Sequence, residues 1–392
     1  MMNLFSDEAR RDPYPIYERL RGLSPVHYVP APFDGWLILD YEGAKRALND
    51  HETFSSAVPA PRHWFIFTDP PAHTKLRALI SRAFTPSTVA NLEPNIRELS
   101  RQLLDGVIER GEMDVAGDLS VPLPMKVIAS MIGIPAADWP KFKRWSDGIL
   151  KLSYARSGSQ EAQEAVREFA AVTAEMDPYL REMTGQRRAA PQNDLLTRLI
   201  EAEVEGERLT HEEILGFFQL LLVGGQETTT NLINNAILCF LENTDQFLLL
   251  RNAAELLPSA IEEVLRYRSP LQWVMRTPRR DIEVQGQPIP AGKLVLPMIG
   301  SANRDPDKFK DADRFDITRA PNAHIAFGHG IHSCVGAVLA RMEARITLSD
   351  FLRRVKNFEL ASKEPWEPRR GLHVHGPTRL PIRFDPAKPE QG

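Results

Sequence analysis

The chain has 392 residues, of which 43% are hydrophobic and 26% are charged, the balance of an ordinary soluble globular protein. Its formal net charge is only -4, which argues against a general nucleic-acid-binding protein. The two cysteines, Cys239 and Cys334, are too few for a disulfide framework, so we expect a cytosolic protein.

The N-terminal stretch is charged, as at Asp7 and Arg10, and therefore lacks the apolar core of a signal peptide. No uninterrupted apolar stretch approaches the roughly 20 residues that span a bilayer. The longest candidate, residues 214–223, contains Gly216 and Gln219. We therefore expect no membrane anchor.

Short elements come first in the chain. Residues 14–21 and 43–49 predict helices, and the apolar run 36–40 between them predicts a strand. Helical signals then dominate from residue 72 to about residue 267, interrupted by prolines.

The pattern of apolar and polar residues changes near the C-terminus. Residues 282–300 alternate and carry Gly-Gln and Ala-Gly turns, which predicts strands, and residues 371–384 have the same pattern. The sequence thus predicts a mainly α protein with small β-sheets, of the α+β class, in which residues 1–392 form a single domain.

The segment DPPAHTKLR, residues 69–77, predicts an extended stretch whose two prolines lead into a helix. His73 and Arg77 are four residues apart and share one face of that helix. Because arginine does not ligate metals, we expect these two donors to bind an anion such as a carboxylate.

A long helix is predicted from about residue 211. Thr210 and Glu213 form a Thr-x-x-Glu capping box at its start. The apolar run that follows ends in GGQETTTN, whose glycines and β-branched threonines are poor helix formers. Three interpretations are open: a notch where another helix crosses, a Glu227 that points to solvent, or a groove that Gly224 and Gly225 leave beside a ligand. In that groove Thr228 would hydrogen-bond instead of completing the backbone ladder.

Two charged groups follow. Glu263 and Arg266 are three residues apart on a predicted helix and can pair, although a surface pair of this kind contributes little. Arg276 has a solvated charge on the simplest interpretation, because Arg279 and Arg280 lie beside it.

The segment FGHGIHSCVG, residues 327–336, holds one of the two cysteines. Apolar residues at nearly helical spacing follow, so Cys334 lies at or just before a helix N-terminus, where the dipole and free N–H groups favour a thiolate. The glycines would let the backbone approach something large and flat. The segment predicts an exposed thiolate that is ready to bind a metal or a bulky cofactor.

Three alternatives remain for Cys334. The simplest is a buried, inert cysteine in a glycine-rich loop. A zinc site formed by His329, His332 and Cys334 would have an unusual spacing and no obvious fourth ligand. A nucleophilic cysteine with a histidine base lacks an orienting acid nearby.

The cysteine segment resembles the haem-binding signature of the cytochrome P-450 superfamily, of the soluble bacterial type. Every fixed position of the pattern Phe-Gly-x-Gly-x-His-x-Cys-x-Gly is matched, by Phe327, Gly328, Gly330, His332, Cys334 and Gly336. The resemblance implies the cytochrome P-450 fold, haem b as the cofactor and Cys334 as the proximal thiolate ligand of the iron. It extends over nearly the whole chain, from about residue 12 to residue 384.

Other motifs resemble family segments in the right order. Glu227 and Thr228 match the acid–alcohol pair of the oxygen-binding segment, which implies a catalytic role in proton delivery, with Gly224 beside the cofactor. Gln226 replaces a histidine of many bacterial members. The implied contacts of the haem propionates are His73, Arg77, Arg276 and His332.

The pair Glu263 and Arg266 resembles the family's Glu-x-x-Arg motif, which ties its helix to a later loop. The implied loop partner is Arg314, with a structural role. Its surroundings depart from the usual Pro-Glu-Arg-Phe form, because Ala312 and Asp313 precede the arginine.

The resemblance implies a monooxygenase that inserts one oxygen atom from dioxygen into a hydrophobic small molecule. A ferredoxin and a ferredoxin reductase would supply the electrons, since the chain shows no flavin or iron–sulfur segment. Lys75, Arg82, Arg341 and Arg345 are candidates for a basic docking face. We expect a cytoplasmic monomer without nucleic-acid or membrane partners.

Two other functions stay open. A peroxide-driven oxygenase of this superfamily usually carries Arg-Pro in place of the acid–alcohol pair, and that dipeptide is absent at this position. A haem sensor would not need Glu227 and Thr228 in the helix notch.

By resemblance, the loop before Asp69 covers an apolar substrate pocket, in which Arg62 or His63 is a candidate contact for a carboxylate. Ordinary core packing is the alternative for each lining residue. The candidates are Trp64, Phe65, Phe67, Phe217, Leu221, Trp273, Val274 and Val374.

Overall fold

The computed structural model describes residues 6–30, 34–57, 63–154 and 159–390. Two compact units are distinguished along the chain, and each is described by itself. Unit 1 comprises Met1–Ser55, Ile96–Leu123 and Thr228–Gly392, and unit 2 comprises Ser56–Asn95 and Pro124–Glu227. That residues 1–392 form one domain stays a prediction.

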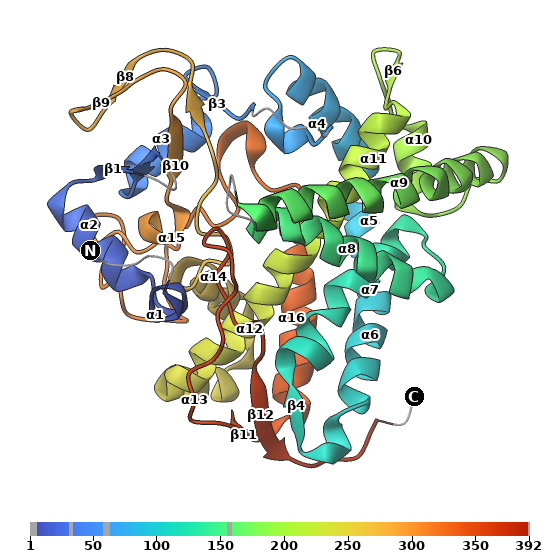
Figure 1. The fold of residues 1–392 in the computed structure, drawn as a ribbon. Coiled ribbons are helices and arrows are strands. Elements are labelled where there is room, and N and C mark those ends of the chain that lie inside the picture. The colour runs from blue at the N-terminus through green and yellow to red at the C-terminus, as the bar shows by residue number, and fades with distance from the viewer. Residues whose placement is uncertain (1–5, 31–33, 58–62, 155–158, 391–392) are drawn as a thin grey trace. The chain divides into compact units, whose positions relative to one another are not determined.

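Unit 1 combines helices with four small sheets (Figure 1). Its helices are α1 (Asp7–Arg11), α2 (Tyr14–Leu23), α3 (Tyr41–Asn49), α13 (Thr244–Asn252), α14 (Leu257–Tyr267), α15 (Ile299–Ala302), α16 (Ala337–Arg354) and most of α6 (Glu93–Asp105) and α12 (Gln226–Glu242). The predicted short helices at 14–21 and 43–49 are confirmed as α2 and α3. The side chain of Asp40 accepts a hydrogen bond from the Gly43 backbone N–H at 2.9 Å, so α3 begins two residues earlier than predicted.

The sheet that matters most for the site pairs β2 (Gly35–Ile38) antiparallel with β1 (Val26–Val29) and parallel with β10 (Leu294–Pro297). The predicted strand at 36–40 is therefore confirmed with a shift of one to two residues. The other sheets of unit 1 join β11 (Lys356–Leu360), β12 (Pro381–Asp385) and β4 (Glu112–Asp114), then β3 (Phe54–Ser55) with β7 (Thr277–Pro278), and β8 (Ile282–Val284) with β9 (Gln287–Ile289).

The strands predicted within 282–300 are confirmed as β8, β9 and β10. The prediction for the tail is only half right, because residues 371–380 form isolated bridges and a regular strand begins only at Pro381. Gly376 and Pro377 lie within that stretch, and both residue types interrupt a β ladder.

The side chains of the central sheet alternate between two hydrophobic clusters of unit 1. Ile38 and Val295 belong to a cluster with α3 and α15, whereas Leu37 and Leu296 belong to a cluster with Tyr17 of α2. This alternation follows from the two-residue period of a strand. It also determines which predicted pocket residues can lie together.

Unit 2 is almost entirely helical. Its helices are α4 (Ala72–Ala83), α5 (Pro86–Ala90), α8 (Trp139–Tyr154), α9 (Gln160–Ala189), α10 (Leu195–Glu201), α11 (His211–Leu220) and most of α7 (Pro122–Ile132), with one hairpin of β5 (Glu203–Val204) and β6 (Glu207–Arg208). The capping box of α11 is confirmed. The Thr210 hydroxyl accepts from the Glu213 N–H at 3.2 Å, and the Glu213 carboxylate accepts from the Thr210 N–H at 2.8 Å.

One segment of the described chain is long and apolar enough to cross a membrane, by length and composition alone. It is Val115–Ile132, so the prediction that residues 214–223 are the longest such candidate is wrong. About two thirds of the window, 67%, is buried inside the structure, as expected for a core helix of a soluble protein.

Candidate functional site

Cys334 lies two residues before Gly336, the N-cap of α16, and its side chain is exposed. Its backbone N–H donates to the Phe327 carbonyl oxygen at 2.9 Å and closes the loop. Gly328 and Gly330 have φ angles of +73° and +72°, which L side chains rarely adopt. The predicted position before a helix N-terminus is confirmed, and the alternative of a buried cysteine is wrong.

Gly330 also explains why the cysteine loop lies against α3. A Cβ atom there would approach the Asn49 Cα atom to 2.9 Å, so a side chain would push the loop away. Among the residues that the structure describes, no three of His, Cys, Asp and Glu are grouped as a metal site. His329, His332 and Cys334 therefore do not form a zinc site.

A charged network supports the first residue of the cysteine loop. The Arg341 guanidinium lies 4.4 Å from the centroid of the Phe327 ring and donates twice to Glu262, at 2.6 and 2.8 Å. His324 also contacts that carboxylate, at 2.9 Å. Burial raises the pKa of Glu262, but the hydrogen bonds from Arg341 and His324 outweigh it and lower the pKa to about 2.

The basic docking face of Lys75, Arg82, Arg341 and Arg345 stays a prediction. The Arg341 guanidinium forms an ion pair with Glu262 within unit 1. In unit 2 the Lys75 ammonium is likewise paired with Glu207, at 2.5 Å. Glu262 could not be assigned to this network from the sequence, because it lies on α14, far from Phe327 and Arg341 along the chain.

Arg276 is buried, with 6% of its surface exposed, so the interpretation of a solvated charge is wrong. Its backbone pairs with Val295 of β10 through two hydrogen bonds of 2.8 Å. Arg279 and Arg280, by contrast, are exposed. A buried guanidinium requires polar partners, and a carboxylate is the partner that it prefers.

In unit 2, α4 begins after Pro71 as predicted. His73 is buried on this helix and its ring lies 6.0 Å from the Phe65 ring, between centroids. Arg77 follows one turn later and is half-buried. His73 and Arg77 therefore share one face of α4, as predicted, with His73 buried and Arg77 half-buried.

Of the stretch GGQETTTN that was predicted to be poor helix, Gly224 and Gly225 end a π-helix, Leu221–Gly225, between α11 and α12. The prediction is wrong for the remaining residues, which form the first turns of the regular helix α12. Single π turns inside α-helices occur often at functional sites. A Cβ on Gly225 would lie 2.8 Å from Ile128 of α7, so this glycine provides the crossing notch. A Cβ on Gly224 would meet only Leu220, at 3.9 Å, so this glycine leaves space open beside the helix.

Glu227 and Thr228 follow directly after this π-helix. Glu227 is buried, which excludes the interpretation that it points to solvent. Thr228 is half-buried. The neighbouring Gln226 is buried and accepts a hydrogen bond from Ser146 of α8, so its side chain belongs to the core of unit 2.

The predicted pocket residues of unit 2 do gather. Trp64 and Phe65 are buried, the rings of Trp64 and Phe67 stack at 5.9 Å, and the Phe65 ring lies 6.2 Å from Phe217 of α11. Leu221 is half-buried at the start of the π-helix. Arg62 lies outside the described residues.

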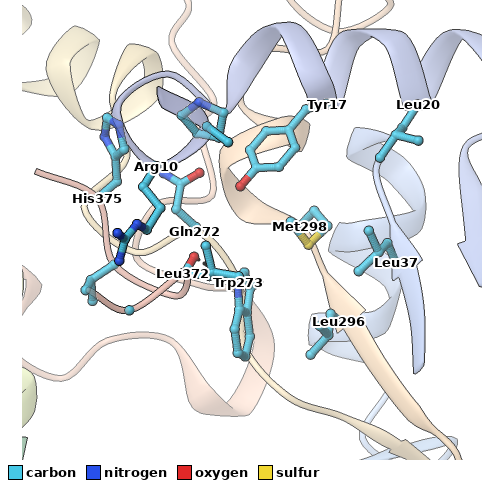
Figure 2. Close-up of a pocket in the computed structure, with 14 residues that line it drawn as sticks. Arg10, Tyr17, Leu20, Leu37, Gln272, Trp273, Leu296, Met298, Leu372 and His375 are labelled. Atoms are coloured by element: carbon cyan, nitrogen blue, oxygen red, sulfur yellow. Dashed lines mark hydrogen bonds between the residues drawn. The ribbon is translucent and has the colours of Figure 1, made fainter. Parts of the chain in front are cut away.

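The predicted pocket residues of unit 1 divide between two places. Trp273 and Val374 line the cavity shown in Figure 2, where the Trp273 indole N–H donates to the Leu372 carbonyl at 3.0 Å. Val274 packs against the other cluster, with Ile38 and Val295, because successive residues of an extended chain point to opposite sides. Trp273 and Val274 therefore pack against different clusters, and their contact with substrate stays a prediction.

The cavity in Figure 2 has a volume of about 40 Å³, small against the roughly 300–1,000 Å³ of ligand pockets. Its walls come from α1, α2, the central sheet and residues 272–273 and 371–375. It is too small to serve as the substrate pocket. That Trp273 and Val374 contact the substrate stays a prediction, with ordinary core packing as the alternative.

The Glu-x-x-Arg pair lies in the interior of unit 1. Glu263 and Arg266 are both fully buried and joined by hydrogen bonds of 2.9 and 2.8 Å. Arg266 donates to the Arg314 carbonyl at 3.0 Å, while the Arg314 side chain is exposed. The side chains of this region that contact Glu263 are Arg319, at 3.2 Å, and Asn322, at 3.1 Å. The predicted role of the Arg314 side chain is thus wrong, because Arg314 contacts the pair through its backbone carbonyl.

Comparison with known proteins agrees with this geometry. The sequence model of the family "Cytochrome P450" matches residues 248–378. Cytochrome P450 109 of Bacillus spizizenii is 40% identical and covers 98% of this chain and 95% of its own. The biotin biosynthesis cytochrome P450 of Bacillus subtilis is 35% identical and covers 97% and 98%.

A solved structure is similar over the same range. The crystal structure of CYP109E1 from Bacillus megaterium in complex with corticosterone has a TM-score of 0.89 and 38% identity, and covers 96% of this chain and 99% of that one. Members of this family bind haem b. The chain therefore belongs to the cytochrome P450 family and is a haem-dependent monooxygenase, which acts on a small molecule with dioxygen and electrons from a redox partner.

Proposed function

We propose that Cys334 is the thiolate ligand of the haem iron. The observation that carries this proposal is an exposed thiol at the start of α16, in a loop whose glycines hold left-handed backbone angles. A soft thiolate suits iron, and the helix N-terminus stabilises its negative charge. Phe327, Gly328 and Gly336 complete the loop around it.

The other cofactor contacts are proposed from the chemistry of their side chains. A haem carries two carboxylates, which call for cationic or N–H donors. The proposed donors are His73 and Arg77 in unit 2, and Arg276 and His332 in unit 1. The burial of Arg276 supports its assignment, since a carboxylate is the partner that a buried guanidinium prefers.

When bound, the haem supplies oxygen activation, which a thiolate ligand promotes by pushing electron density toward O–O cleavage. The chain's own part is to deliver protons. We propose that the Thr228 hydroxyl holds a proton beside the space left by Gly224, and that the Glu227 carboxyl resupplies it. The burial of Glu227 supports this role, because bulk water then does not deliver protons to Thr228 in place of the Glu227 carboxyl.

Replacing Thr228 with alanine is expected to waste electrons. Without the hydroxyl, proton delivery is mistimed, and reducing equivalents leave as peroxide or water. We expect product per electron to fall by about a hundredfold, the low end of the effect of removing a general acid–base group. Product and peroxide are measured against NAD(P)H consumed, and Thr228→Ser is the matched control, which keeps the hydroxyl and the yield. An alanine variant with unchanged yield would remove Thr228 from this role.

The substrate is proposed to be a hydrophobic small molecule. The buried aromatic side chains of unit 2, from Trp64 to Phe217, support an apolar wall. A relative was solved with corticosterone, which makes a steroid a reasonable first probe. Titration of the haem protein with corticosterone tests this class. Binding is monitored through the shift of the Soret band that accompanies a change in the spin state of the iron.

The redox partners are proposed to be a ferredoxin and its reductase. Arg345 lies on α16, the helix that begins after Cys334, and is half-buried. Arg345→Glu is expected to slow ferredoxin-dependent reduction several-fold at low salt and to reduce the salt dependence of the rate. Arg341→Glu is a poorer test, because it also breaks the ion pair with Glu262. An unchanged rate in Arg345→Glu would place the partner elsewhere.

We also propose that the protein is a cytoplasmic monomer. The small number of cysteines and the burial of the segment Val115–Ile132 support this environment. Light scattering of the purified holoprotein gives the oligomeric state directly.

A further inference from the structure

Three side chains of unit 2 form a continuous chain of hydrogen bonds, which is buried at Trp64 and Gln219 and half-buried at Thr173. The Trp64 indole N–H donates to the Gln219 side-chain carbonyl at 3.1 Å, and the Gln219 amide nitrogen donates to the Thr173 hydroxyl at 3.0 Å. Trp64 precedes the short helix Phe65–Phe67, Gln219 lies on α11, and Thr173 lies on α9. We call these residues the Trp64 clamp.

The amide of Gln219 has only one orientation that satisfies both partners. An indole N–H is a donor only, so the carbonyl of the amide must face Trp64 and its nitrogen must face Thr173. Gln219 has 3% of its surface exposed and Trp64 has 5%. Both groups are therefore held in an interior where an unpaired polar atom is costly.

The backbone beside the clamp lies very close to α11. A Cβ atom on Gly216 would lie 2.2 Å from the His63 carbonyl oxygen, so any other residue would push the segment off the helix. Gly216 and Gln219 are three residues apart and so lie on neighbouring positions of one helix face. The Phe65 ring meets Phe217 on the same helix. The segment 63–67 is thus held on α11 by backbone approach, aromatic contact and a buried hydrogen bond.

Simple core packing does not account for Gln219. A leucine would fill the interior position of an apolar helix at no cost in desolvation, whereas a buried glutamine has to satisfy a carbonyl and an amide nitrogen. In this protein the two ends of one side chain join two other elements, α9 and the segment 63–67. Such a residue stabilises a particular arrangement rather than a hydrophobic core in general.

We propose that Gln219 is a positioning residue, which clamps the segment 63–67 to α11 and α9 and thereby sets how fast a small molecule enters and leaves the haem site. The inference rests on the proposed function in one respect, namely that this segment covers the substrate. The clamp itself stands on contacts within unit 2.

The clamp is tested by hydrogen exchange of the holoprotein. The Phe67 N–H is bonded to the Trp64 carbonyl at 2.9 Å and the Thr68 N–H to the Phe65 carbonyl at 3.2 Å, so both amides report opening of the segment. In Gln219→Leu and in Trp64→Phe we expect these amides to exchange about tenfold faster, the effect of losing one buried hydrogen bond. The double variant is expected to exchange no faster than either single variant, because both remove the same interaction.

Two further variants keep the test interpretable. Thr173→Val removes the outer partner and is expected to give a smaller rise, and it replaces Gln219→Leu if the latter does not fold. Gln186→Leu is the control, because Gln186 is an exposed residue of α9 whose amide donates to Glu182 on the same helix. Exchange in Gln186→Leu should match the unaltered protein. Unchanged exchange in both Gln219→Leu and Trp64→Phe, or effects that multiply in the double variant, would overturn the clamp.

The effect on ligand passage is tested with 4-phenylimidazole, which binds haem iron through its nitrogen. Bound 4-phenylimidazole is displaced, and its dissociation is monitored by stopped-flow absorbance. In Gln219→Leu and in Trp64→Phe we expect dissociation about tenfold faster than in the unaltered protein, at unchanged haem content. Faster exchange with unchanged dissociation would overturn the role in passage. A purified protein without haem would instead contradict the proposed function, while hydrogen exchange would still decide whether the clamp exists.

Discussion

Cys334→Ser is expected to abolish the thiolate signature of the haem and to reduce monooxygenase turnover to background. A serine hydroxyl stays protonated at neutral pH and offers the iron a hard, neutral oxygen in place of a soft thiolate. The fold should survive, because the Cys334 side chain is exposed and α16 begins after it. The absorption spectrum of the reduced variant with carbon monoxide checks the result.

The other cysteine provides the matched control. Cys239 is fully buried, and burial raises the pKa of its thiol to about 12, so it remains protonated. Cys239→Ser places a hydroxyl in that interior and is expected to cost about 1–3 kcal/mol of stability while the haem spectrum stays unchanged. If Cys334→Ser kept the spectrum, or if Cys239→Ser lost it, the assignment of the ligand would be wrong.

Glu263→Gln is expected to be the most destabilising single change in unit 1 that leaves the cofactor loop intact. Glu263 accepts from Arg266, from Arg319 and from the backbone N–H of Asp316, all inside the protein. Removing its charge leaves the buried Arg266 guanidinium uncompensated, which typically costs about 3–5 kcal/mol. That is a large part of the roughly 5–15 kcal/mol by which proteins of ordinary stability are held folded. Denaturant unfolding and haem content measure the loss.

Arg314→Ala and Arg319→Ala are the controls for this prediction. The Arg314 side chain is exposed and only its carbonyl bonds Arg266, so alanine should change stability by less than about 0.5 kcal/mol. Arg319 contacts Glu263 through its side chain, and alanine should cost about 2 kcal/mol. An Arg314→Ala variant as unstable as Glu263→Gln would contradict the conclusion that Arg314 supports the pair through its backbone.

The features of the site that depend on residues close together in the sequence were predictable. The capping box of Thr210 and Glu213 and the position of Cys334 before α16 both follow from residues within four positions of each other. The same holds for His73 and Arg77 on one face of α4. In each case one turn of helix fixes the geometry, so no tertiary contact is needed to decide it.

The contacts that the sequence did not predict join residues that lie far apart along the chain. Arg314 and Arg319 lie in one loop, and nothing in their spacing tells which of them turns its side chain toward Glu263. Trp273 and Val274 both looked apolar enough for a pocket, but as successive residues of an extended segment they pack against different clusters. For Gln219, a glutamine within an apolar helical run was the available signal of a buried polar contact, yet its partners Trp64 and Thr173 lie far away in sequence.

The most direct test of the account is the absorption spectrum of the purified, reduced protein exposed to carbon monoxide. A Cys334 thiolate that ligates the iron would donate electron density to it, which predicts a strongly red-shifted Soret band. Bound haem without that shift would contradict the central claim, since it would mean that Cys334 is protonated or is not the ligand.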